Sequence, residues 1–250
     1  MVDIYYPYVE SEAKWQELKY SLRSIEKHFQ FDFKVWITGD LPEWITNVNH
    51  IPHKRCVGMQ ENTTYDAIAK LLAFCNHPHS GPGFIRMYDD VYVLREVFLD
   101  ELKLIKAVQT WEEIDQDNYE IWYRQLIRTL ETVKRHGYRG FSTESHFPEF
   151  FETGKMASII RFYNALENRL LTSSLYYNTI FPELEPRVDA SDVGIRFYFN
   201  RDSKYYHSSE GDLHSKCQGM YYLNHNDSGL TDNLKRFLEE SFPNKSRFEK

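Results

Sequence analysis

Two adjacent carboxylates interrupt an otherwise apolar stretch of the chain. The segment FIRMYDDVYVL, residues 84–94, places Asp89 and Asp90 between apolar and aromatic residues that are typical of a buried strand. Because an unpaired carboxylate is costly to bury, the pair is expected where this strand ends or bends. One carboxylate can hold Mg²⁺ or Mn²⁺ there, while the other binds the ion through water or holds a sugar hydroxyl. The alternative is a turn with two solvated aspartates.

A histidine and two arginines could act beside such an ion. His146 stands just ahead of a proline in SHFPEFF, and a histidine can move a proton near neutral pH. It is one of 10 histidines, so by itself it identifies no site. Arg161 and Arg169 share one expected helix. Either could hold a phosphate through paired hydrogen bonds, and the alternative is an arginine on the protein surface.

A polar cluster follows the last expected strand. In YYLNHNDSG, Asn224, His225 and Asp227 come directly after aromatic and apolar residues. They become metal or sugar ligands if this strand ends beside Asp90, because ligands collect at the carboxyl ends of strands in an open α/β sheet. Otherwise they form an ordinary turn, for which Asn, Asp, Ser and Gly are well suited.

Alternating strands and helices are expected to position these residues. Strands are expected where β-branched and aromatic residues gather, and helices where apolar residues recur at three- and four-residue steps. The expected strands are 3–9, 33–40, 48–53, 84–94, 193–200 and the first part of 219–229. The expected helices are 12–29, 63–77, 155–171, 173–181 and 230–242, with a long helical stretch at 98–136 and a loop at 136–151. This order predicts an α/β fold with a mostly parallel central sheet flanked by helices.

Length, charge and cysteine content narrow the class of protein. The 250 residues suit one catalytic domain, 1–250, with a helical insertion at 98–140. A net charge of −7 argues against a nucleic-acid-binding surface. Cys56, Cys75 and Cys217 show neither a metal-binding pattern nor a disulfide framework, which favours a reduced, cytoplasmic protein. No signal peptide or transmembrane segment is expected, although the basic and aromatic C-terminal end could contact the inner face of a membrane.

The order of the segments resembles the Stealth family of sugar-phosphate transferases. VDIYYPYVES resembles the family's opening block, FIRMYDDVYVL its second, HFPEFF its third and YYLNHNDSGLTDNLKRFLEESFPNKSRFE its last, which ends in FPxKSxFE. These four blocks follow the family's order from residue 2 to residue 249. There are departures: Glu10-Ser11 replaces Asp-Gly, Tyr88 replaces an asparagine, and Ser173 stands where an acidic residue is usual.

The resemblance implies a nucleotide-sugar-binding fold of the GT-A type. It also implies metal-dependent transfer of a hexose-1-phosphate from a nucleotide sugar, expected to be a UDP-sugar, to a hydroxyl of an acceptor glycan. Capsular and other cell-surface polysaccharides are the usual acceptors, and the ion would be Mg²⁺ or Mn²⁺. The implied catalytic residues are His146, Arg169 and Asp90, the metal ligands are Asp89, Asp90 and Asn224, and the donor-binding residues are Glu10, Asp66 and Asn224.

Two other functions remain open. A glycosyltransferase with the same fold would form a glycosidic bond and release a nucleoside diphosphate instead of a monophosphate. A relative without catalytic activity would bind a nucleotide sugar or a glycan only. The helical stretch at 98–136 could serve any of these as an acceptor platform, a lid or an interface.

Overall fold

The central sheet of the molecule has five strands. The computed structural model describes residues 1–56, 62–183, 188–199 and 202–250. The sheet has the order β3 (Asn49–Pro52), β2 (Phe33–Gly39), β1 (Val2–Tyr8), β4 (Gly83–Arg86) and β7 (Glu149–Glu152). β1 to β4 run parallel and β7 is an antiparallel edge, so the predicted mostly parallel sheet is confirmed.

Two smaller sheets complete the strand architecture. The first joins β5 (Val91–Val93), β10 (Tyr222–His225) and β9 (Gly194–Phe197), with β10 in the middle. The second pairs β6 (Lys106–Ala107) with β8 (Val188–Asp189). The three-stranded sheet matters for function because it carries the last polar cluster of the sequence, at the end of β10, into the neighbourhood of the central sheet.

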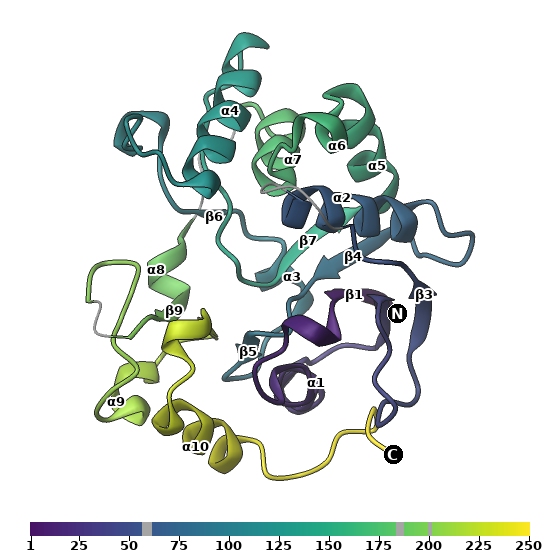
Figure 1. Ribbon diagram of the computed structural model, residues 1–250, viewed down its shortest axis with the longest axis vertical. Helices are drawn as coiled ribbons and strands as arrows, with labels where there is room; N and C mark the ends of the chain where they lie inside the picture. Colours follow the sequence, from purple (N-terminus) through teal and green to yellow (C-terminus); the bar gives the residue numbers. More distant parts are fainter. Residues whose placement is uncertain (57–61, 184–187, 200–201) are drawn as a thin grey trace.

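Helices cover both faces of the central sheet (Figure 1). The longer helices are α1 (Glu17–His28), α2 (Asn62–Cys75), α4 (Ile121–Arg135), α5 (Thr153–Phe162), α7 (Thr172–Ile180) and α10 (Asp232–Ser241). The short ones are α3 (Leu99–Leu102), α6 (Ala165–Asn168), α8 (Ala190–Val193) and α9 (Leu213–Cys217), and there are 3-10 turns η1 (Glu10–Glu12), η2 (Trp111–Glu113) and η3 (Asp227–Gly229). None of the helices in the described ranges is both long and apolar enough to cross a bilayer.

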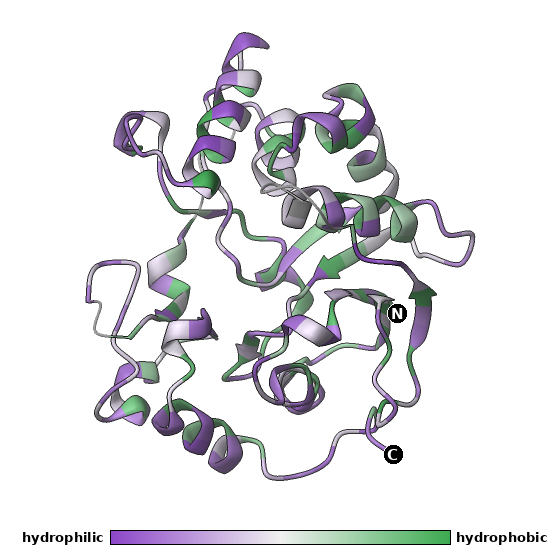
Figure 2. Cartoon of the chain, in the orientation of Figure 1, coloured by the Kyte–Doolittle hydropathy of each residue, from purple (hydrophilic) through white to green (hydrophobic). Residues whose placement is uncertain are grey.

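Side-chain alternation along β1 explains why two layers of helices pack on it. Successive strand residues point to opposite faces. Ile4 and Tyr6 therefore join the apolar cluster around α1, whereas Tyr5 joins the cluster around α2, α5 and α7. Figure 2 shows that α4 and α10 carry hydrophilic and hydrophobic residues in alternation along their length, as expected of helices that cover a core on one side only.

The segment 84–94 forms two strands instead of one. β4 ends at Arg86 in the central sheet, and β5 begins at Val91 in the three-stranded sheet. The link between them holds the two aspartates, as the cost of burying carboxylates predicts. Ser21 on α1 fixes the link, because its hydroxyl lies 2.6 Å from the carbonyl oxygen of Val91 and 3.2 Å from that of Tyr88.

Other boundaries also differ from the sequence-based expectation. The helix expected at 12–29 begins at Glu17, and the loop expected at 136–151 ends in strand β7. The stretch 98–136 contains α3, β6 and η2 before the long helix α4. The assignment of residues 1–250 to one domain, with an insertion at 98–140, stays a prediction.

The C-terminal segment FPNKSRFE is part of the core. Glu249 accepts hydrogen bonds from Nε and Nη2 of Arg23 on α1, both at 2.8 Å, and Phe248 is buried beside the same helix. Ser246 donates its backbone N–H to Glu249 at 2.8 Å. This segment therefore packs against α1, and its residues are not among those described as lining the candidate site.

Candidate active site

A cavity of about 500 Å³ opens at the carboxyl ends of the strands. Its floor is formed by residues at or just beyond the ends of β4 and β10 and by residues of β1. Its walls come from α2, from the start of α4 and from the segment before β7. The chemistry-bearing residues among those that line it are Arg86, Asp90, Glu144, His146, Arg196, Asn224 and His225. The position agrees with the general rule for ligand sites in open α/β sheets.

His146 and Asp90 form the polar centre of this cavity. Nε2 of His146 lies 3.0 Å from Oδ1 of Asp90, and the imidazole stacks on the ring of Tyr88 with centroids 4.1 Å apart. The side chain of His146 is 43% exposed, which leaves its other face open to a ligand. Its φ of 55° places it in the left-handed region. Such backbone is rare outside glycine and persists only where the surroundings hold it.

Neighbouring strands hold the backbone on both sides of this histidine. Asn224 on β10 donates from Nδ2 to the carbonyl oxygen of His146 at 2.9 Å. Arg196 on β9 donates to the carbonyl oxygen of Ser145 at 2.5 Å. The hydroxyl of Ser145 in turn donates to Glu149 at 3.1 Å. These contacts explain how the chain keeps His146 in its unusual conformation.

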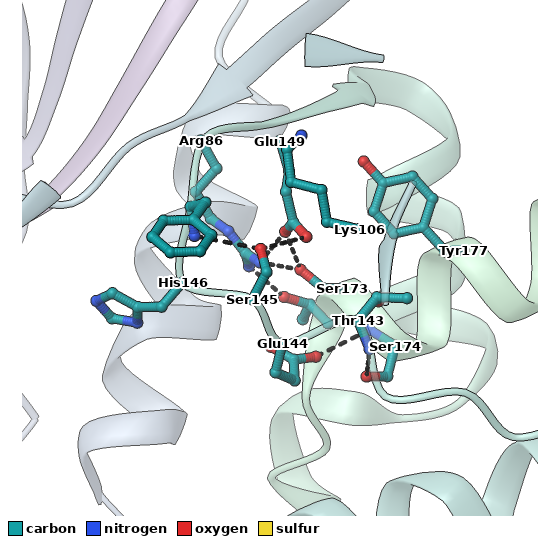
Figure 3. A network of polar contacts seen from close by, with 12 residues as sticks. Arg86, Lys106, Thr143, Glu144, Ser145, His146, Glu149, Ser173, Ser174 and Tyr177 are labelled. Carbon is teal, nitrogen blue, oxygen red and sulfur yellow. Dashed lines mark hydrogen bonds and ion pairs between the residues drawn. The ribbon is translucent and has the colours of Figure 1, made fainter. Parts of the chain in front are cut away.

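A buried polar network lies behind His146 (Figure 3). Arg86 at the end of β4 pairs with Glu149 at 3.2 Å and donates to Thr172 at 2.8 Å and to Ser173. Ser173 also donates to Glu149 at 2.6 Å. In Figure 3 the network extends from β7 to α7 and ends at the segment that carries His146. It therefore connects the central sheet to the catalytic candidate.

The two aspartates have opposite electrostatic environments. Burial alone would raise the pKa of Asp90, but His146 and His225 hold that pKa below its ordinary value. Burial and the neighbouring charge of Asp90 raise the pKa of Asp89 to about 7. Asp90 is thus a carboxylate at neutral pH, whereas Asp89 retains its proton until the pH approaches neutrality.

The residues around Asp90 fit a divalent ion that a substrate helps to hold. Asn224 pairs with Val91 across two strands, which brings its side chain beside Asp90 at the cavity. A carboxylate and an amide oxygen, completed by substrate phosphates, suit Mg²⁺ or Mn²⁺. Nδ1 of His225 lies 3.0 Å from a carbonyl oxygen, which can only accept, so Nδ1 carries a proton, and Nε2 lies 3.1 Å from the hydroxyl of Tyr92. Both nitrogens of His225 are therefore engaged.

A preformed metal centre is not part of this arrangement. In the described ranges, no three His, Cys, Asp or Glu side chains gather in a way that could hold a metal ion. Asp89 is not among the described residues that line the cavity. It lies toward α1, where its charge adds to burial in raising the pKa values of Tyr6 and Tyr8. Both aspartates lie in the turn between β4 and β5, and their joint role as metal ligands stays a prediction.

Three further predicted site residues also lie outside the described lining of the cavity. Glu10 is exposed in η1, and its backbone N–H donates to Asp40 at 2.9 Å. Asp66 is buried on α2, where it pairs with Lys70 at 2.6 Å. Arg169 follows α6 in a left-handed conformation, with φ of 51°. The donor-binding and catalytic roles predicted for these three residues stay predictions.

Two of the open alternatives at the sequence level are now resolved by position. Asn224 and His225 line the cavity, so β10 does end at the site, while Asp227 is 79% exposed and faces Lys14. Arg161 donates to Asn76 at the surface. The polar cluster after β10 therefore divides between the site and an ordinary surface turn.

The sequence reasoning missed two arginines at the site. Arg86 and Arg196 both line the cavity, and both are more than nine-tenths buried. Each sits inside a short apolar strand, in FIRM and GIRF. A charged residue in such a strand is costly unless it has a partner or a ligand, and this is the signal that could have identified them.

Two solved structures of a galactosyltransferase share this fold. Two solved structures of the galactosyltransferase LgtC, one of an active-site mutant and one in complex with donor and acceptor sugar analogs, match with a TM-score of 0.54. They are 12% and 11% identical to this chain, and each match covers 98% of both chains. LgtC is a GT-A glycosyltransferase, so the predicted GT-A fold is confirmed. No family model and no curated protein matches the chain, and the resemblance to the Stealth family stays a prediction.

Proposed function

We propose that this protein transfers a sugar from a nucleotide-sugar donor to a hydroxyl of an acceptor glycan. The observation that carries the proposal is the convergence of His146, Asp90 and Asn224 on one cavity at the carboxyl ends of the strands. A cavity of about 500 Å³ has room for a substrate of this size. The fold, which is that of known glycosyltransferases, supports the same class of reaction.

His146 is the general base in this proposal. Asp90 is ionised and can only accept a hydrogen bond, so the proton of neutral His146 lies on Nε2, which donates to Asp90. Nδ1 then offers a lone pair to the acceptor hydroxyl. Asp90 fixes the tautomer and stabilises the imidazolium that forms when the proton is taken.

A divalent ion would be held by Asp90 and Asn224 together with the donor's phosphates. When bound, Mg²⁺ or Mn²⁺ supplies positive charge that favours departure of the nucleotide. Asn224 would then have two roles, because its amide nitrogen donates to the carbonyl oxygen of His146 and its amide oxygen would bind the ion. Asp89, the neighbouring aspartate in the link between the sheets, would bind the ion through water.

The bond formed distinguishes two candidate reactions. We favour attack at C1 of the sugar, because the solved structures that share the fold are of a galactosyltransferase; Arg169, the cation expected to stabilise a phosphoryl group, is not among the described residues lining the cavity. Transfer of a sugar-1-phosphate is the second candidate. It is favoured by the family resemblance and by the His146–Asp90 pair, which could equally activate a hydroxyl for attack at phosphorus.

Release of the nucleotide tests the proposal and separates the two reactions. The protein is incubated with a panel of nucleotide sugars, beginning with UDP-sugars, and with Mn²⁺ or Mg²⁺, with and without chelator. Nucleoside diphosphate as the product supports glycosyl transfer, and nucleoside monophosphate supports sugar-phosphate transfer. Binding of a nucleotide sugar without any turnover, in the presence of glycan acceptors, would contradict both and indicate a binding protein.

Replacement of the general base provides the second test. His146→Ala is expected to lower the turnover rate about 10²- to 10⁴-fold, the usual contribution of general-base catalysis. His214→Ala is the matched control, since the side chain of His214 is 70% exposed and does not line the cavity. A loss below tenfold at His146, or an equal loss in both variants, would remove His146 from the catalytic role.

A further inference from the structure

The two arginines at the cavity differ in how their charge is balanced. Arg86 is paired with the carboxylate of Glu149. Arg196 is only 8% exposed, and no carboxylate pairs with it among the described residues. It contacts the carbonyl oxygen of Ser145, the ring of Phe147 at 5.4 Å and the hydroxyl of Tyr206. None of these partners is a carboxylate, so Arg196 has no ion pair among the described residues, although Asp90 and Glu144 line the same cavity.

A buried cation without a counter-ion carries an energetic cost. Burial lowers the pKa of Arg196 from its ordinary value, which reflects the same penalty, although the neighbouring tyrosines oppose it. Proteins normally compensate such a group with an opposite charge. Because Arg196 borders the cavity, an anion entering that cavity can supply the missing charge.

The sheet register places Arg196 next to the catalytic candidates. Arg196 on β9 lies opposite Asn224 on β10 in the parallel pairing, so the two side chains share one face at the spacing of adjacent strands. Together they hold consecutive carbonyl groups, those of Ser145 and His146. A guanidinium has five N–H donors, and the contacts to Ser145 and Tyr206 leave others for a ligand.

We propose that Arg196 binds the diphosphate of the donor, as a catalytic residue of the reaction proposed above and dependent on that proposal. In glycosyl transfer the bond between C1 and the β-phosphate oxygen breaks, and its electron pair goes to that oxygen. The acceptor oxygen forms the new bond to C1 and gives its proton to Nδ1 of His146. Arg196 donates hydrogen bonds to the diphosphate, whose negative charge grows in this step.

Binding of inorganic pyrophosphate tests the role of Arg196 without knowledge of the sugar or base. Affinity is measured by calorimetry for the intact protein, with Mg²⁺ present, in the wild type, Arg196→Lys, Arg196→Gln and Arg161→Gln. Arg196→Gln is expected to bind about 10- to 100-fold more weakly, the usual effect of losing a hydrogen bond to a charged group. Arg196→Lys should lie between, because lysine keeps the charge but not the paired donors. Arg161→Gln removes a surface arginine outside the described lining of the cavity and should bind as the wild type does.

The salt dependence of binding distinguishes a direct contact from a role in holding the loop. If Arg196 touches the anion, Arg196→Gln should show a weaker dependence of affinity on ionic strength than the wild type, because one charge has left the site. A loop-holding role would lower affinity without that change. Pyrophosphate affinity of Arg196→Gln within twofold of the wild type, or an unaltered salt dependence, overturns the inference.

Failure of the proposed function would look different. A wild type that binds pyrophosphate through Arg196 but turns over no nucleotide sugar supports an anion site and contradicts the transferase. A wild type that releases nucleotide from a donor but binds no pyrophosphate contradicts the role of Arg196 and keeps the transferase. The melting temperature of each variant, measured beside the binding experiment, identifies any variant that has failed to fold. If Arg196→Gln does not fold, the pyrophosphate affinity of Arg196→Lys tests the role of Arg196.

Discussion

Removal of the charge on Glu149 should destabilise the protein by several kilocalories per mole. Glu149 is 1% exposed and receives three hydrogen bonds, from Arg86 at 3.2 Å, Ser173 at 2.6 Å and Ser145 at 3.1 Å. Glu149→Gln keeps the shape but leaves the guanidinium of Arg86 buried without its counter-charge. Breaking a buried pair in this way costs about 3–5 kcal/mol. In a chain of this length each kcal/mol lowers Tm by about 2–4 °C, so the expected decrease is about 6–20 °C.

Urea unfolding at pH 7.5 measures the change in free energy, and the same strand supplies the control. Glu152 pairs with Lys155 at the surface, where both side chains are about half exposed, at 45% and 49%. Glu152→Gln should cost about 0–1 kcal/mol, the usual worth of a surface ion pair. The double variant Glu149→Leu with Arg86→Met should recover much of the lost stability, because it buries neither charge. A cost for Glu149→Gln no larger than that of Glu152→Gln would refute this account of the network.

Three further outcomes are expected. Asp89→Asn should stabilise the protein at pH 8. The pKa of Asp89 is raised to about 7 in the folded protein, so the wild-type side chain contributes stability below pH 4 and loses that contribution as the pH rises through 7. The difference in unfolding free energy between the variant and the wild type, measured with urea, should reach about 4 kcal/mol at pH 8 and vanish toward pH 4. A difference that does not change with pH would contradict this prediction. Trp122→Ala should raise KM for the acceptor about two- to tenfold, because the indole of Trp122 is 39% exposed and lines the cavity. Tyr119→Ala should leave KM unchanged, because the ring of Tyr119 is 85% exposed and is not among the described residues lining the cavity. Equal KM values in the two variants would exclude an acceptor platform at the start of α4. Glu249→Ala should lower the unfolding free energy by about 1.5–3 kcal/mol, because its two hydrogen bonds with Arg23 are lost. A smaller change, measured by urea unfolding, would mean that the C-terminal segment is held by its aromatic residues.

The sequence was most informative where local chemistry decides structure. The apolar segment of β1 and the periodic helix α2 lie close to their predicted bounds, since burial on both sheet faces and on one helix face leaves a clear pattern. The aspartates at 89–90 predicted a strand end, because no packing could offset two buried charges. Thr231 caps the last helix, as threonines commonly do, and its hydroxyl accepts the N–H of Leu234 at 3.2 Å.

Long-range geometry accounts for what the sequence did not reveal. Strand β7 is short and pairs antiparallel at the sheet edge, so only its partner β4 makes it a strand. Arg169 follows α6 in a left-handed conformation, which helical spacing along 155–171 could not anticipate. Arg196 reaches the site because β9 pairs with β10, a contact between strands that lie almost thirty residues apart. The structure brings together Asp90, His146, Asn224 and His225, which the residue types along the chain had already indicated as candidates.

The ion pair between Arg23 and Glu249 also affects the order in which the chain can fold. The two residues are 226 positions apart, and their ion pair joins α1 to the segment around residue 249. During synthesis the N-terminal strands can begin to pair, but α1 lacks this contact until the C-terminal segment has left the ribosome. Contacts of such sequence separation slow folding, since the chain between them must be closed first. Until then α1 is held on the sheet by its own apolar residues Leu18, Leu22 and Ile25, so the nascent protein should be less stable than the finished one.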